Sequence, residues 1–190
     1  MAGAGILKEN RSTMKRMLCF LLITAGIGAA RSQKVNPIIK DFGSVWEVPF
    51  AKEKPSPSTQ YNILVDITDA ASKPDTLNGY LEAVATLINL HGAGGVPAEH
   101  IHTVVVLHKM ATYSIFTNEM YQQKFKMDNP NLALIRSLKA AGVEFITCGQ
   151  TLFRGKIPES AITPEVTIAT SALTTLTTYQ LKGYASINFK

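Results

Sequence analysis

The chain has 190 residues, enough for one domain with a substantial core, and 46% hydrophobic with 17% charged residues is an ordinary soluble mixture. The formal net charge is +5, but residues 1–30 supply +3 of it through four basic residues against Glu9, which leaves +2 for the rest. No cluster of basic residues indicates a nucleic-acid-binding face, so we expect no nucleic-acid partner.

Residues 1–30 have the three-part pattern of a secretory signal peptide. Two basic residues, Lys15 and Arg16, precede an apolar run at residues 17–27, and small residues follow the run. The run is shorter than the roughly 20 apolar residues of a membrane-spanning helix. We therefore expect cleavage, an exported or periplasmic mature chain, and no stable membrane insertion afterwards. An uncleaved N-terminal anchor is the alternative.

The chain contains two cysteines, and their positions limit what they can do. Cys19 lies inside the apolar run of the expected signal peptide, so cleavage would leave Cys148 as the only cysteine of the mature chain. A lone cysteine cannot form an internal disulfide. Cys148 is therefore a buried thiol, a reactive thiol or half of an intermolecular bridge.

Residues 31–60 form a lead-in of different composition. Pro49, Pro55 and Pro57 stand among charged residues and serines. This mixture predicts an extended arm or linker that lies on a surface or crosses to a neighbouring subunit.

From Tyr61 onward, short apolar runs alternate with segments of helical periodicity, which predicts one α/β domain over residues 61–190. The expected strands are 61–68, 102–108, 143–148, 165–170 and 184–189. The expected helices are 77–91, 111–126 in one or two pieces, 128–142 and 171–183. Strands that alternate with helices form right-handed βαβ units, so we expect a flavodoxin-like or Rossmann-like three-layer sandwich with a mainly parallel five-stranded sheet.

Capping residues mark the ends of the last two expected helices. Asn129 is the expected N-cap of the helix at 128–142, with Pro130 in its first turn and Gly142 at its end. Ser171 is the expected N-cap of the final helix, and Gly183 stops it.

Ligands of such folds bind beyond the carboxyl ends of the parallel strands, so the residues that end each strand are the candidates for chemistry. Asp66 stands near the end of the first strand, and His108 and Lys109 end and follow the second. Cys148 ends the third strand, and Ser171 follows the fourth. The lone thiol and the histidine at equivalent strand ends are the most specific pair.

Cys148 has two interpretations from the residues alone. If "GQTLFRG" at 149–155 begins a short helix, the thiol lies at a helix N-terminus, where free N–H groups favour the thiolate. His108, Lys109 or Arg154 would help further, and the thiolate could attack sulfane sulfur or a disulfide. The other interpretation is an inert core cysteine, because free cysteine is among the most buried residue types.

Three other features favour structural interpretations. The glycines of "HGAGG" at 91–95 follow a helix and lack phosphate-loop spacing, so we expect a helix end and turn. His100 and His102 have no third ligand nearby in sequence, which favours a solvated strand edge over a metal site. Asp66 either orients His108 or Lys109 or caps the turn after its strand, and we prefer the turn.

The segments "YNILVDIT", "TVVVLH", "DNPNLALIRSLKAAGVEFITCGQT" and "ATSALTTLTTYQLKGYASINF" resemble the DsrE/DsrF-like family, especially its exported single-domain members. The resemblance covers roughly residues 42–190. It implies a flavodoxin-like fold, a homo-oligomer such as a trimer or hexamer, and a persulfide-carrying cysteine at Cys148, as in sulfur-relay members. Many relatives follow the histidine that matches His108 with Gly-Pro, whereas this chain has Lys109 and Met110.

We therefore hypothesise an exported sulfur carrier or sulfurtransferase that handles small sulfur species or a partner thiol. Cys148 would be nucleophile and carrier, and His108 would assist proton transfer or stabilise the thiolate. The predicted substrate-binding residues are Lys109, Arg154, Gln150 and Ser171, and no metal or other cofactor is required. The rival hypothesis is a non-catalytic oligomeric module that keeps the fold and holds a small ligand, and a flavin or nucleotide site rests on fold analogy alone.

Overall fold

The computed structural model describes residues 33–189. Five parallel strands form the central sheet in the order β6-β5-β4-β3-β7. The strands are β3 (Tyr61–Ile67), β4 (Ile101–Leu107), β5 (Glu144–Cys148), β6 (Val166–Ala169) and β7 (Ala185–Phe189). Because every neighbouring pair in this sheet is parallel, all five carboxyl ends lie at one edge. The predicted three-layer α/β fold and its five strands are confirmed.

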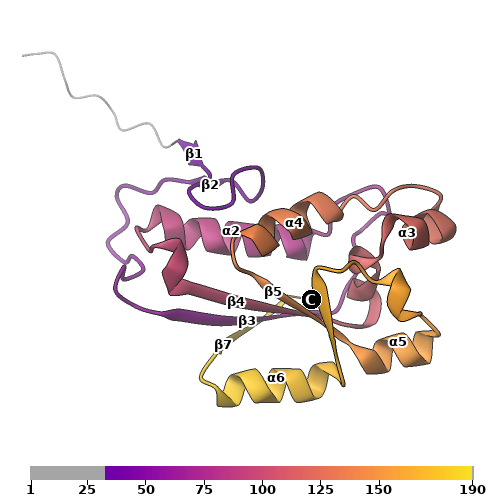
Figure 1. Cartoon of the computed structure of the whole chain (residues 1–190). Coiled ribbons are helices and arrows are strands. Elements are labelled where there is room, and N and C mark those ends of the chain that lie inside the picture. The colour runs from indigo at the N-terminus through magenta and orange to yellow at the C-terminus, as the bar shows by residue number, and fades with distance from the viewer. Residues whose placement is uncertain (1–32, 190) are drawn as a thin grey trace, which may run out of the picture. The chain divides into compact units, whose positions relative to one another are not determined.

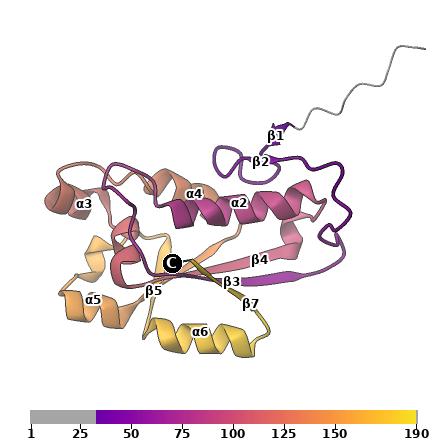
Figure 2. The same cartoon turned by 180° about the vertical axis from the view of Figure 1, so that it is seen from behind.

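Helices cover both faces of the sheet, as Figures 1 and 2 show from opposite sides. The helices α2 (Gly79–Ala93) and α4 (Leu132–Ala140) lie on one face, and α5 (Gly149–Gly155) and α6 (Ala172–Leu181) lie on the other. The chain adds β4, β5 and β6 in one direction and then returns past β3 to place β7. A right-handed crossover in the reverse direction puts its helix on the opposite face, which explains the position of α6 but not that of α5, which lies between β5 and β6.

The segment after β4 contains two separate helical pieces, one of the two forms that the sequence allowed. The 3₁₀ helix η2 (Lys109–Ile115) precedes α3 (Asn118–Phe125). Two shorter 3₁₀ turns, η1 (Ala98–His100) and η3 (Glu159–Ala161), lie before β4 and β6. Thr117 caps α3 by accepting a hydrogen bond from the Met120 N–H.

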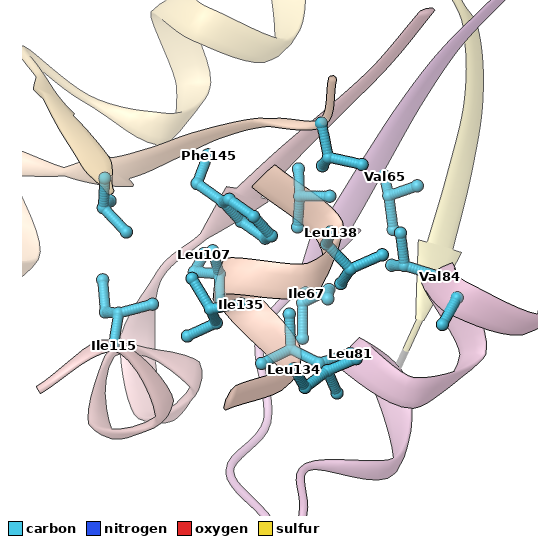
Figure 3. Close-up of a cluster of buried hydrophobic side chains, with 14 of the residues drawn as sticks. Val65, Ile67, Leu81, Val84, Leu107, Ile115, Leu134, Ile135, Leu138 and Phe145 are labelled. Carbon is cyan, nitrogen blue, oxygen red and sulfur yellow. The ribbon is translucent and has the colours of Figure 1, made fainter. Parts of the chain in front are cut away.

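The main core lies between the sheet and the face formed by α2 and α4. Figure 3 shows Leu81 and Val84 of α2 and Leu134, Ile135 and Leu138 of α4 packed toward strand residues such as Val65 and Phe145. These side chains are almost fully buried. Each contributes about 1.5–3 kcal/mol through its removal from water, which makes this layer the main source of stability.

The start of α4 differs from the expectation that Asn129 is its N-cap. The helix begins two residues later, with Asn131 at the N-cap position. The Asn129 side chain instead accepts from the Asn131 N–H at 2.9 Å and donates to the carbonyls of Ser114 and Phe116. Asn129 therefore forms a local turn and ties the end of η2 to α4, because an asparagine side chain readily bonds the backbone two residues on.

Residues 33–60 lie against the outer surface of α2. Their short strands β1 (Lys34–Val35) and β2 (Val45–Trp46) pair antiparallel, and Ile39 and Val45 are buried. The buried side chain of Asn89, on α2, accepts from the N–H groups of Ile38 and Ile39 at 3.0 and 2.8 Å. It also donates to the carbonyls of Ile39, Phe42 and Gly43 at 2.9–3.0 Å. Residues 47–60 contain turns at Val48–Ala51 and Ser56–Thr59, and the first half of the predicted arm is anchored to the domain through Asn89.

The expected signal peptide at residues 1–30 lies outside the described residues. Within residues 33–189, no helix combines the length and the apolar character needed to span a membrane.

Candidate functional site

The carboxyl edge of the sheet brings together Asp66 of β3, His108 after β4 and Cys148 of β5. Leu107 is paired with Thr147 in the β4–β5 register, so His108 and Cys148 leave neighbouring strands at the same level. Successive side chains of a strand point to opposite faces. Asp66 and Cys148 therefore share the α6 face with Leu64 and Ile146, and His108 follows the same alternation because its backbone is extended.

The Asp66 carboxylate and the His108 imidazole form a hydrogen-bonded pair. The His108 Nε2 lies 2.9 Å from the Asp66 Oδ1, and both side chains are mostly buried, at 14% and 12% exposed. The preferred interpretation of Asp66 as a turn cap was wrong, because its carboxylate is hydrogen-bonded to the His108 ring. The hydrogen bond at Nε2 fixes the orientation of the imidazole ring, and Nδ1 is the other ring nitrogen that can gain or lose a proton.

Cys148 combines burial with a polar surrounding. Its side chain is 6% exposed and packs in a small apolar cluster with Leu64, Val106 and Ile146. Burial raises the pKa of the thiol, but hydrogen bonding from the Ala172 backbone, the Thr151 side chain and the backbone of Thr151 and Gln150 outweighs it, and the pKa is lowered overall. The site therefore favours the thiolate, which is the nucleophilic form of cysteine.

Two helices begin beside the sulfur. Cys148 occupies the N-cap position of α5, as the sequence predicted, although the thiol makes no regular capping hydrogen bond there. The N-terminus of α6 also faces the sulfur, because hydrogen bonding from the Ala172 N–H lowers the pKa of the thiol. The sequence predicted this helix but not that its first N–H group would reach Cys148, because that approach depends on the long return from β6 to β7 across the sheet.

Gly149 allows the tight turn that presents Cys148. A Cβ at this position would lie 2.7 Å from the carbonyl oxygen of Ala169, at the end of the neighbouring strand β6. Any side chain here would push β6 away from the start of α5. The glycine after the cysteine is therefore required by this close approach of two backbones.

Lys109 and Thr151 connect the loop after β4 to α5. Lys109 has a left-handed backbone with φ of 53°, a conformation that favours glycine over other residues. Its N–H donates to the Thr151 Oγ1 at 3.3 Å. Thr151 was not among the residues predicted for the site, although its position three residues after the cysteine in a helix places it on the same side.

The remaining predicted residues lie on the same two helices. Gln150 and Arg154 are exposed on α5. Ser171 is the N-cap of α6, as predicted, and its hydroxyl accepts from the Thr174 N–H at 3.1 Å. The Lys109 side chain is also exposed, and Arg154 stands in the last turn of α5, six residues after Cys148.

The two histidines of the H-x-H pair have local partners. The His100 Nδ1 contacts the Pro57 carbonyl at 2.8 Å, and the His102 Nε2 contacts the Gln60 side chain at 3.2 Å. The described part of the chain contains no group of three or more metal-binding side chains. The glycines at 91–95 end α2 and turn the chain, as expected, with Gly94 at the C-cap.

Comparison with known proteins identifies the family of the domain. A family model described as "DsrE/DsrF-like family" matches residues 60–189. A solved structure of a protein of unknown function from Methanobacterium thermoautotrophicum is similar, with a TM-score of 0.53 and 18% sequence identity over 68% of this chain and 99% of that one. This likeness concerns the fold. No curated protein matches the chain.

Proposed function

The chain belongs to the DsrE/DsrF-like family, and from this premise we propose that it is an exported carrier of sulfane sulfur that holds the sulfur as a persulfide on Cys148. The single observation that carries the proposal is the lowered pKa of the Cys148 thiol despite its burial. A buried cysteine that serves only as core filling has its pKa raised by its apolar surroundings. Donors directed at the sulfur instead favour the charged form that attacks sulfur.

The transfer step needs no net oxidation. The Cys148 thiolate attacks the outer sulfur of a donor persulfide, which forms a new S–S bond to Cys148 and breaks the S–S bond of the donor. The donor leaves as a thiolate, and Cys148 now carries the extra sulfur. An acceptor thiolate then attacks that outer sulfur and releases Cys148 as the thiolate again.

The neighbouring groups have distinct roles in this proposal. His108, oriented by Asp66, exchanges the proton that the thiol loses and the leaving thiolate needs. Lys109 and Arg154 attract an anionic sulfur species to the edge of the sheet. Gln150 and Ser171, next to the thiol at the starts of α5 and α6, complete the contact surface for the substrate.

Export and self-association are part of the same proposal. The signal-peptide pattern of residues 1–30 supports an exported, periplasmic location, which fractionation and N-terminal sequencing of the secreted chain would test. Exposed apolar side chains support self-association, and the family resemblance implies a trimer or hexamer. Leu173 and Leu181 of α6 are 75% and 90% exposed, and Phe153 of α5 is 83% exposed. Light scattering with the variant Leu173→Glu would show whether this face associates.

The direct test is mass spectrometry of the intact protein after incubation with glutathione persulfide. We expect the wild-type protein to gain one sulfur atom on Cys148 and to return it to added thiol. Cys148→Ser is the matched control and should gain none. The proposal fails if the wild-type protein gains no sulfur under conditions in which a small thiol does.

A second candidate function, a non-catalytic assembly or binding module, is favoured by one observation. The Cys148 side chain is only 6% exposed and contacts aliphatic neighbours. A donor must therefore reach the sulfur from the open edge of the sheet. If the native thiol resists both persulfide and alkylating reagents until the protein unfolds, the module is the better description.

A further inference from the structure

The further inference concerns Thr151, which the family resemblance does not assign to the site, and it rests on the proposed function of Cys148. Thr151 lies in the first turn of α5, three residues after Cys148. Its side chain is half-buried. It therefore stands between the thiol and the loop that follows His108.

The hydrogen bond from Lys109 determines how the Thr151 hydroxyl can be used. The Lys109 N–H donates to Oγ1 at 3.3 Å, so it occupies one lone pair of that oxygen. A hydroxyl has a single hydrogen to donate. Because the oxygen accepts from Lys109, that hydrogen is available for the sulfur of Cys148. Hydrogen bonding from the Thr151 side chain lowers the pKa of this thiol.

The unusual backbone of Lys109 supports a specific role for this contact. Lys109 has φ of 53°, a left-handed conformation that is uncommon for residues other than glycine because the Cβ atom crowds the backbone. This conformation follows directly after His108 and directs the Lys109 N–H to Thr151. The histidine loop and the cysteine helix are thus joined through one hydroxyl.

We propose that Thr151 is a positioning residue of the Cys148 site, whose hydroxyl, held by the Lys109 N–H, donates a hydrogen bond to the sulfur in its anionic form. The contact couples the His108 loop to the thiolate. Loss of the hydroxyl removes a donor to the charged form and makes the thiolate less favourable. Serine retains the donor at this position, and valine retains the shape without it.

The test measures the rate of Cys148 alkylation by iodoacetamide across a pH series in folded wild-type, Thr151→Val and Thr151→Ser proteins. We expect the midpoint of the Thr151→Val profile to rise by roughly one pH unit, which is about a tenfold smaller thiolate fraction below both midpoints. Thr151→Ser should return the midpoint to near the wild-type value. A purely structural role would change the unfolding midpoint in urea without moving the pH profile.

The outcomes separate this inference from the function on which it rests. A low wild-type midpoint with an unchanged Thr151→Val midpoint overturns the role of Thr151 and leaves the reactive thiol intact. A wild-type midpoint at or above that of the urea-unfolded chain overturns both. A raised midpoint in Thr151→Ser equal to that in Thr151→Val would show that the hydroxyl is not the group responsible.

Discussion

Replacement of Asn89 by alanine tests whether residues 33–46 are part of the folded domain. Asn89 is fully buried on α2, and its side chain makes five hydrogen bonds to the backbone of this segment. Alanine removes all of them and takes away the side-chain partner of the Ile38 and Ile39 N–H groups and of the Gly43 carbonyl. A buried backbone group left without a partner costs more free energy than a hydrogen bond normally contributes, so the effect should be large.

The magnitude follows from the number and burial of these bonds. At about 1 kcal/mol each, five bonds give about 5 kcal/mol. Asn36 donates to two of the same carbonyls, those of Ile39 and Phe42, and compensates in part. We expect Asn89→Ala to lower the free energy of unfolding by about 4 kcal/mol. Asn36→Ala, the matched control, removes bonds from a more exposed position and should cost about 1 kcal/mol.

Urea denaturation gives the two free energies, and hydrogen exchange of the Ile39 amide locates the effect. We expect that amide to lose its protection in Asn89→Ala before the sheet amides do, because its acceptor is the Asn89 Oδ1. If Asn89→Ala costs no more than Asn36→Ala, the segment does not depend on this network in solution and the reasoning is wrong.

Three further predictions concern the surroundings of the site. Lys109→Gly should be about 1 kcal/mol more stable than Lys109→Ala in urea, because both lose the charge but only glycine relieves the left-handed backbone; equal stability would contradict the strain. Gly149→Ala should lower the free energy of unfolding by about 2 kcal/mol, because the new methyl group would contact the Ala169 carbonyl. Gly79→Ala, whose methyl group meets no atom within 4 Å, should be neutral or stabilising. A harmless Gly149→Ala would show that β6 can move. The pKa of Cys148 is lowered in the folded state, so between that pKa and the unfolded value of about 8.5 the folded protein binds fewer protons than the unfolded chain. The free energy of unfolding should therefore rise with pH through this window and decline as the pH falls to the folded pKa. Cys148→Ser should lack that slope, and the comparison belongs below pH about 10, because the raised pKa values of Tyr121 and Tyr179 act in the opposite sense above it.

The pattern of the sequence was sufficient for the order and type of the five sheet strands and the main helices, but not for the short strands β1 and β2. The apolar runs that became β3, β4 and β5 are buried on both faces, so their composition is distinctive. The N-cap of α4 was less predictable. Both Asn129 and Asn131 can cap a helix, and the choice depends on carbonyls of η2, which are distant in sequence. The anchoring of residues 33–46 likewise depends on Asn89, about 50 residues away.

The site was predicted only where it follows from strand ends. The positions of His108 and Cys148 come directly from parallel strands that end together. The sequence favoured a turn cap for Asp66 over a role in orienting His108, because sequence alone does not show that the two side chains meet. The contact of Ala172 with the thiol required three-dimensional information about where α6 returns, and the bond from Lys109 to Thr151 depends on how the Lys109 backbone turns. The position of Thr151 beside Cys148 follows from helical spacing alone.

The most direct measurement of the central claim is the pH dependence of Cys148 alkylation by iodoacetamide in the folded wild-type protein, compared with the same chain unfolded in urea. The account predicts that the folded thiol reacts and that its midpoint lies below the midpoint of the unfolded chain. A folded thiol that does not react, or one whose midpoint equals or exceeds the unfolded value, would contradict a thiolate held ready at the edge of the sheet.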